Sequence, residues 1–187
     1  MSTLDHPNQG VDPSTVSPWP TSSRYGLIGA LILIVAGLGM YLGNMIDYTG
    51  QDSSANWISN IINWGIMIAV TVLAVKKHRD EELGGYISFG RAFQSGFFVN
   101  LVITLITAVW TFIFFSFVAP DHLDIILEAS RDQMIEQQGL SGEDLDNAMG
   151  FVSWMFTPTM MTLFATFGTL VFGAILSVIV GLVMKKE

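Results

Sequence analysis

The residues of this sequence that could take part in chemistry are few, and the clearest group is a row of acids in the region 121–146. Carboxylates are hard oxygen ligands of the kind that Ca²⁺ and Mg²⁺ prefer, so a cation site is one interpretation. No EF-hand loop accompanies the row, and a solvated face of a helix is the interpretation that we favour. The acids that recur at helical spacing are Asp121, Asp124, Glu128, Asp132 and Glu136.

One histidine, His122, lies beside Asp121 and Asp124, where it would form an acid–base pair or supply a metal ligand. A single histidine without a partner motif supports neither role well. The sequence also lacks GxSxG, HExxH, CxxC and a phosphate-binding loop. We therefore predict that the protein is not an enzyme, and we assign it no catalytic, cofactor-binding or metal-binding residue and no cofactor.

A second group of polar residues lies inside long apolar stretches. Asn100, Thr104 and Thr107 recur at helical spacing on one stretch, and Asn63 and Thr71 lie on the preceding one. Two interpretations are open: these groups bond the helices to each other, at about 0.6 kcal/mol each, or they line a narrow polar path. We favour bonding between helices, because Thr71 and Asn100 lie at similar depth from one membrane face.

Four apolar stretches carry these polar residues and contain no Asp, Glu, Lys, Arg or His. Ionisable groups at membrane depth mark proton and ion pathways, so a proton-coupled transporter is not expected. About 20 apolar residues span a hydrocarbon core of ~30 Å, and we predict an all-α integral membrane four-helix bundle built from two transmembrane hairpins. The predicted helices are at about 25–46, 57–75, 92–118 and 158–184.

A change in composition near residue 24 divides the chain into a tail and a membrane domain. Residues 1–23 are rich in Pro, Ser and Thr and are predicted to be a disordered cytoplasmic tail, which leaves 24–187 as the membrane domain. The first helix also contains a GxxxG pattern, from Gly39 to Gly43. Such small residues let helices approach closely, either within the subunit or between subunits.

The outer loop 119–157 is predicted to form an amphipathic helical hairpin between the third and fourth membrane helices. Asp121 is expected to cap a helix that ends at Gly139. Ser141 and Asp144 resemble a capping box at the start of a second short helix. We place this hairpin on the extracytoplasmic side, against the membrane surface or over the end of the bundle.

The orientation follows from the distribution of lysine and arginine. Of the 8 such residues, only Arg131 lies on the side of the outer hairpin. The positive-inside rule then places both termini and the connector between the second and third helices in the cytoplasm. The bases on that side are Arg24, Lys76, Lys77, Arg79, Arg91, Lys185 and Lys186.

The connector, residues 76–98, combines bases, glycines and aromatic side chains, and it has two interpretations. In the one that we favour, it is an interfacial helix start whose Arg91 extends to the lipid headgroups. In the other, it is a docking site for a cytoplasmic partner or a neighbouring subunit. The aromatic residues recur at helical spacing and the glycines permit tight turns or close contact: Tyr86, Phe89, Phe93 and Phe97, with Gly85, Gly90 and Gly96.

The connector sequence GGYISFGRAFQSGF resembles the signature of a family of bacterial four-helix membrane proteins catalogued as domain of unknown function 4199. The resemblance extends over roughly residues 24–186, including the proline after the third helix and the proline that opens the fourth. It implies a bacterial inner-membrane location and a common architecture, and it supplies no substrate, reaction or partner.

Composition agrees with a membrane protein: 51% of the residues are hydrophobic and 13% are charged. The lack of a basic patch of useful size argues against nucleic-acid binding.

We predict a non-enzymatic inner-membrane protein that acts through protein–protein or protein–lipid contacts. Its partners would be the lipid bilayer together with either a second copy of the chain or other membrane proteins. The alternative is a subunit of a small oligomeric channel or carrier lined by the Asn and Thr residues.

Overall fold

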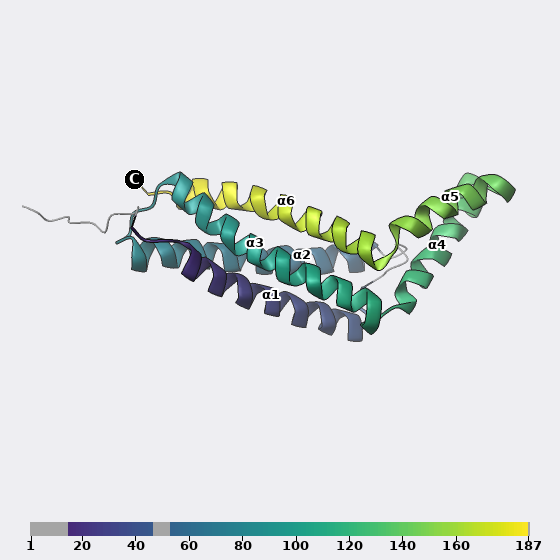
Figure 1. The fold of residues 1–187 in the computed structure, drawn as a ribbon, viewed down its shortest axis with the longest axis horizontal. Helices are drawn as coiled ribbons and strands as arrows, with labels where there is room; N and C mark the ends of the chain where they lie inside the picture. Colours follow the sequence, from purple (N-terminus) through teal and green to yellow (C-terminus); the bar gives the residue numbers. More distant parts are fainter. Residues whose placement is uncertain (1–14, 47–52, 187) are drawn as a thin grey trace, which may run out of the picture. The chain divides into compact units, whose positions relative to one another are not determined.

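The structure, a computed structural model, describes residues 15–46 and 53–186, and the regular elements in these residues are helices. Two of them are short π-helical turns, at His78–Glu82 and Phe114–Val118. The six α-helices (Figure 1) are α1 Trp19–Leu42, α2 Ser53–Lys77, α3 Phe89–Ile113, α4 Asp121–Gln138, α5 Gly142–Met155 and α6 Pro158–Met184.

Four helices in the described residues are long and apolar enough to cross a membrane. They are Trp19–Leu42, Asn56–Glu82, Phe89–Val118 and Pro158–Met184. The predicted fold class, an all-α membrane protein with four spanning helices and a helical hairpin before the last, is confirmed. The extracytoplasmic position of that hairpin stays a prediction.

The start of α1 differs from the prediction. The helix begins at Trp19 and ends at Leu42, so residues 19–23 are not part of a disordered tail. Pro20 lies in the first turn, where backbone N–H groups have no helical partner and a proline is tolerated. The Pro-rich composition was therefore misleading at this point. Residues 1–14, which make up most of the predicted tail, lie outside the described part of the chain.

The helix before the connector is longer than predicted, and the helix after it begins ahead of the predicted membrane span 92–118, with Ser88, the residue expected to cap it, directly before its first residue. Helix α2 continues through Lys77 into a π-helical turn that ends at Glu82, well beyond the predicted end at residue 75. Helix α3 begins at Phe89, directly after Ser88, and its π-helical turn ends at Val118. The connector is consequently short, and charged residues that were expected in a loop are held in helical turns.

The hairpin of α4 and α5 has the predicted helices but not the predicted caps. Gly139, at φ 65°, ends α4, and its N–H donates to the carbonyl of Ile135. Pro120 occupies the cap position of α4, so Asp121 is the first helical residue and its side chain caps nothing. Ser141 is the N-cap residue of α5 but makes no capping bond through its side chain. Both predictions of side-chain capping are wrong.

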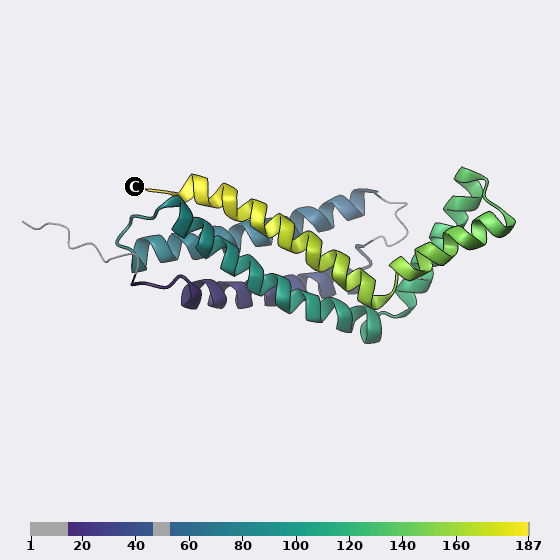
Figure 2. The same ribbon diagram turned by 45° about the horizontal axis from the view of Figure 1, so that its top comes forward.

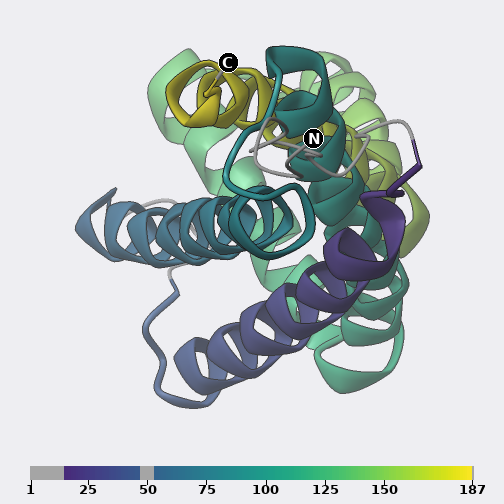
Figure 3. The same ribbon diagram turned by 90° about the vertical axis from the view of Figure 1, so that its left-hand side faces the viewer.

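The chain divides into two compact units, and each contains part of all four spanning helices. The first comprises the residues up to Gly29 together with Ile66–Ile103 and Leu170–Glu187. The second comprises Ala30–Gly65 and Thr104–Thr169. Within the second unit, α4 and α5 run side by side (Figure 2) and bury Leu145 and the apolar side of α4. Within the first unit, the connector passes beside the end of α6 (Figure 3).

Helix packing in the first unit depends on glycines other than those of the GxxxG pattern. A Cβ placed on Gly26 of α1 would lie 2.7 Å from the Cβ of Val102 on α3, so this glycine permits close contact between the two helices. Gly39, by contrast, has open space at the same position, and Gly43 meets only the carbonyl of Gly39 and the side chain of Met45. The predicted packing of Gly39 and Gly43 against another helix of the subunit is not found in the described residues.

Candidate interaction site at the connector

The connector is shaped by a π-helical turn and two glycines. The N–H of Leu83 donates to the carbonyl of His78 at 3.1 Å and closes the turn at the end of α2. Gly84 and Gly85 follow at φ 69° and 95°, a backbone region in which a side chain would be strained. Gly85 is therefore required by the turn itself, and it brings the chain back towards the start of α3.

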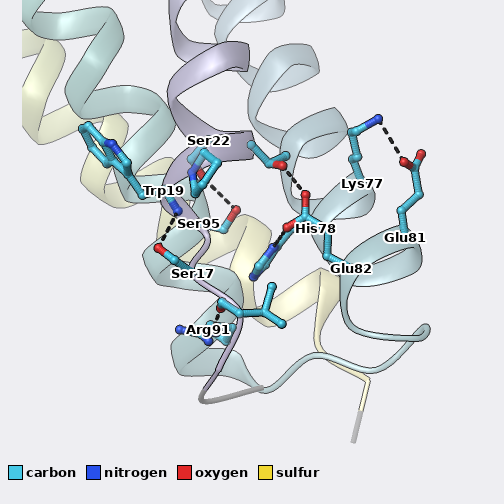
Figure 4. Close-up of polar contacts among 12 residues, drawn as sticks. Ser17, Trp19, Ser22, Lys77, His78, Glu81, Glu82, Arg91 and Ser95 are labelled. Atoms are coloured by element: carbon cyan, nitrogen blue, oxygen red, sulfur yellow. Dashed lines mark hydrogen bonds and ion pairs between the residues drawn. The ribbon is translucent and has the colours of Figure 1, made fainter. Parts of the chain in front are cut away.

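A buried histidine, His78, is the first residue of this turn. His78 has no exposed surface, and its Nδ1 lies 2.6 Å from Oε2 of Glu82 (Figure 4). The hydroxyl of Thr21, on α1, donates to Oε1 of the same carboxylate. The Nε2 atom of His78 has no hydrogen-bond partner in the described residues. Glu82 thus joins the turn to α1 through both of its carboxylate oxygens.

This arrangement does not have the geometry of a nucleophilic triad. In a triad, an imidazole lies between a hydroxyl and a carboxylate and removes the proton of the hydroxyl. Here the carboxylate of Glu82 lies between His78 and Thr21, so the imidazole does not contact the hydroxyl. The cluster is suited to holding two helices together, with the carboxylate as the shared acceptor.

The start of α1 is bound to the connector at further points. The hydroxyls of Ser22 and Ser95 lie 3.0 Å apart and are both buried. The guanidinium of Arg91 donates to the backbone carbonyl of Val16. Trp19 also packs edge-on against Phe98, with ring centroids 5.3 Å apart. The first turn of α1 and the segment just before it are therefore fixed to α3 by both polar and aromatic contacts.

The end of the chain is bound to the same connector. Ile87 and Lys186 exchange two backbone hydrogen bonds of 2.9 Å, in the manner of an isolated antiparallel bridge. The amino group of Lys186 lies 5.2 Å from the centre of the Tyr86 ring, a cation–π distance. Arg79 also donates to the carbonyl of Met184 at 3.4 Å. Both ends of the described chain thus meet at residues 78–98.

Charged side chains of the connector largely neutralise one another. Arg79 forms two contacts with Asp80, at 2.7 and 3.2 Å, and Lys77 lies 2.9 Å from Glu81. Lys76 is not part of an ion pair found in the described residues. Among the three bases at this end of α2, Lys76 is therefore the one without a salt bridge in the part of the chain that the structure describes.

The aromatic series of the connector forms a stack along α3. The rings of Phe89 and Phe93 are 6.3 Å apart, and those of Phe93 and Phe97 are 5.9 Å apart, at interplanar angles below 30°. Gly181 of α6 lies against this stack, since a Cβ there would be 3.2 Å from the ring of Phe89. Tyr86 is separate from the stack and is 58% exposed.

The three glycines singled out by sequence have different positions. Gly85 forms the turn, whereas Gly90 is exposed and has open space beside it. Gly96 is buried, and a Cβ there would lie 3.2 Å from Thr71 and 3.3 Å from Ser177. Only Gly96 therefore serves close contact between helices.

The structure brings Thr71 and Asn100 together and adds a third partner. The amide of Asn100 donates to the hydroxyl of Thr71 at 3.1 Å and lies 3.3 Å from the hydroxyl of Ser177, as well as 2.9 Å from the carbonyl of Gly96. All three side chains are buried. The contact therefore joins α2, α3 and α6, whereas the sequence suggested only a pair between the second and third helices.

The other predicted polar residues lie in the second unit. Thr104 is buried, and the hydroxyl of Thr107 donates to the carbonyl of Thr104 in its own helix at 3.3 Å. Asn63 is half-buried.

The ring of His122 packs against the ring of Tyr41, with centroids 5.1 Å apart. Within residues 15–46 and 53–186, no group of three His, Cys, Asp or Glu side chains could hold a metal ion.

Sequence reasoning missed His78, Thr21 and Glu82. His78 lies among the bases Lys76, Lys77 and Arg79, and Thr21 lies within the predicted tail 1–23. One local signal was present, since His78 and Glu82 are four residues apart and share a face of a helix. The contact with Thr21 has no local signal, because 61 positions separate the two residues.

Comparison with known proteins gives one match. A family model described as "Protein of unknown function (DUF4199)" matches residues 24–186, which is most of the chain. No curated protein and no solved structure matches.

Proposed function

The chain belongs to the DUF4199 family of proteins of unknown function, and we propose that it is a non-enzymatic bacterial inner-membrane protein that acts through contacts with other proteins or lipids. In this proposal the connector and both termini face the cytoplasm. The distribution of bases supports this orientation, because Arg131 alone lies on the side of the α4–α5 hairpin.

The observation that carries the proposal is the attachment of both ends of the described chain to the connector. Glu82 binds the start of α1 and Ile87 binds the segment after α6. A surface held from two sides loses little conformational entropy when a partner binds it. Tyr86 and Phe89 remain exposed on this surface, and aromatic side chains are frequent anchors of protein interfaces.

The contact of Asn100 supports this proposal over the alternative of a polar conduit. Its amide is directed at hydroxyls of neighbouring helices, and those hydroxyls are buried with it. Groups that line a water path would face water instead. In the first unit, the polar residues that suggested a conduit thus act as bonds between helices.

Site-specific crosslinking in native membranes tests the proposal. A photoreactive amino acid would replace Tyr86 or Phe89, and a control would replace Leu73, which is 52% exposed on α2. We expect discrete adducts from the first two positions, with a protein or a lipid, and a different pattern from Leu73. The same pattern at all three positions would rule out the connector as the contact surface.

Transport measurements provide the second test. The purified full chain would be reconstituted into liposomes loaded with a panel of ions and small solutes. We expect no flux above that of empty liposomes. Reproducible and solute-selective flux would overturn the proposal and favour the channel or carrier.

A further inference from the structure

We propose that an apolar groove between α2 and α6 binds an anionic phospholipid, with an acyl chain in the groove and the phosphate at Lys76 and Lys185. This inference rests on the proposed function, because it identifies the chemistry of one of the lipid contacts. The groove lies wholly within the first unit.

The groove has a volume and a lining that suit a hydrocarbon chain. Its volume is about 360 Å³, within the usual range of small-molecule sites. The side chains that line it are apolar and include Ile68, Val72, Phe172, Ile179, Val183 and Met184. An acyl chain has no polar atoms to satisfy and fits such a lining, whereas a polar ligand would lose its hydrogen bonds to water there.

The length of the groove corresponds to one leaflet of a bilayer. Its α6 side extends from Phe172 to Met184, which corresponds to roughly 16–18 Å at the rise of an α-helix. Half of a typical hydrocarbon core is about 15 Å. A single acyl chain that runs from the membrane surface to the midplane would therefore occupy the groove along its length.

Positive charge lies where the headgroup of this lipid would be. Ile68, Val72 and Lys76 are four residues apart on one face of α2, so Lys76 continues the line of the groove by one turn. Lys185 directly follows Met184 at the end of the α6 side and is exposed. The apolar lining is thus followed by positive charge, just as the acyl chain of a phospholipid is followed by its charged headgroup.

The ion pairs of the connector leave this charge available. Asp80 is four residues from Lys76 and interacts with it electrostatically, but both of its carboxylate oxygens are bound by the guanidinium of Arg79. Lys77 is paired with Glu81. Lys76 is consequently the base of this run that an external phosphate can neutralise, and an anionic lipid is favoured over a zwitterionic one.

Lipid binding to the purified full chain tests the inference. Native mass spectrometry would compare phosphatidylglycerol with phosphatidylcholine of identical acyl chains. We expect the wild-type chain to retain phosphatidylglycerol preferentially. Each lysine contributes about five-fold to binding of an anionic lipid, so the Lys76→Gln/Lys185→Gln variant should lose roughly 25-fold in affinity for phosphatidylglycerol and little for phosphatidylcholine.

Two further variants locate the lipid. Val72→Phe fills the groove and should weaken binding of both lipids, and circular dichroism would show that it keeps its helices. Arg24→Gln removes an exposed base of the same unit that does not line the groove, and it should leave binding unchanged.

Several results would overturn the inference. Equal retention of the two lipids by the wild-type chain would exclude an anionic site. An equal effect of Arg24→Gln and the double lysine variant would show charge attraction without a site. A loss of dimers in Val72→Phe, with lipid binding unchanged, would assign the groove to a second copy of the chain. The crosslinking at Tyr86 is independent of these results, so the proposed function stands or fails separately.

Discussion

The close contact between α3 and α6 leads to a specific prediction for Gly173→Ala. A Cβ at this position would lie 2.6 Å from the Cβ and 3.0 Å from the Cγ of Asn100, whereas ordinary contacts begin near 3.4 Å. The two helices must therefore separate by almost 1 Å or tilt. We expect this movement to break the bonds that the amide of Asn100 makes with Thr71 and Ser177.

The magnitude follows from two terms. Overpacking of a closely packed interface costs about 1–3 kcal/mol. The two interhelical hydrogen bonds add about 0.6 kcal/mol each. The sum is a loss of roughly 2–4 kcal/mol in the free energy of unfolding, which is a large fraction of the stability of a small domain.

The assay is unfolding of the purified chain in bicelles, followed by circular dichroism during titration with sodium dodecyl sulfate. Gly168→Ala is the matched control, because Gly168 lies on the same helix and has open space where the Cβ would be. We expect the control to be neutral or slightly stabilising. In an Asn100→Gly background, which removes the side chain that the new Cβ would meet, Gly173→Ala should cause little further loss of stability. Equal stability of the Gly173 and Gly168 variants would refute the close contact.

Three other predictions concern the polar contacts and the orientation. Asn100→Leu should lower the free energy of unfolding by about 1 kcal/mol without altering flux in liposomes. Unchanged stability together with the loss of a transport activity would contradict the role of the Asn100 amide as a bond between helices. Thr21→Val should cost about 1 kcal/mol in thermal unfolding, because the bond to Glu82 is lost, whereas Thr21→Ser should retain wild-type stability; a stable Val variant would show that the bond contributes nothing. In a chain without cysteine, Tyr86→Cys should be protected from impermeant thiol reagents outside intact cells and Glu128→Cys should be labelled; the reverse pattern would invert the topology.

Local sequence signals were sufficient for the elements with clear ends. Pro158 opens α6 and Lys185 follows its last residue, and the predicted bounds of 158–184 are those of the structure. Gly139 likewise ends α4, because its left-handed backbone favours glycine. These residues act through their own backbone or charge, so no knowledge of the tertiary structure is needed to interpret them.

Contacts between distant segments could not be predicted in the same way. The early start of α1 is compatible with its prolines, but its attachment depends on Glu82 and Ser95, which lie far along the chain. The GxxxG pattern indicates a contact that is not found in the described residues, because Gly39 has no side chain or backbone of another helix beside it. Gly26, which is outside the pattern, packs against α3. Spacing identifies residues that permit contact and does not identify the partner.

The bridge between Ile87 and Lys186 also constrains how the protein is made. The two residues are separated by about a hundred positions, so the ribosome adds the second roughly 5–20 s after the first, at about 5–20 residues per second. During that interval the backbone groups of Ile87 have not yet received their final partner. Helices α1 and α2 are made before this interval, and α3 to α6 are synthesised during it, so the bridge closes only when the last helix has been made.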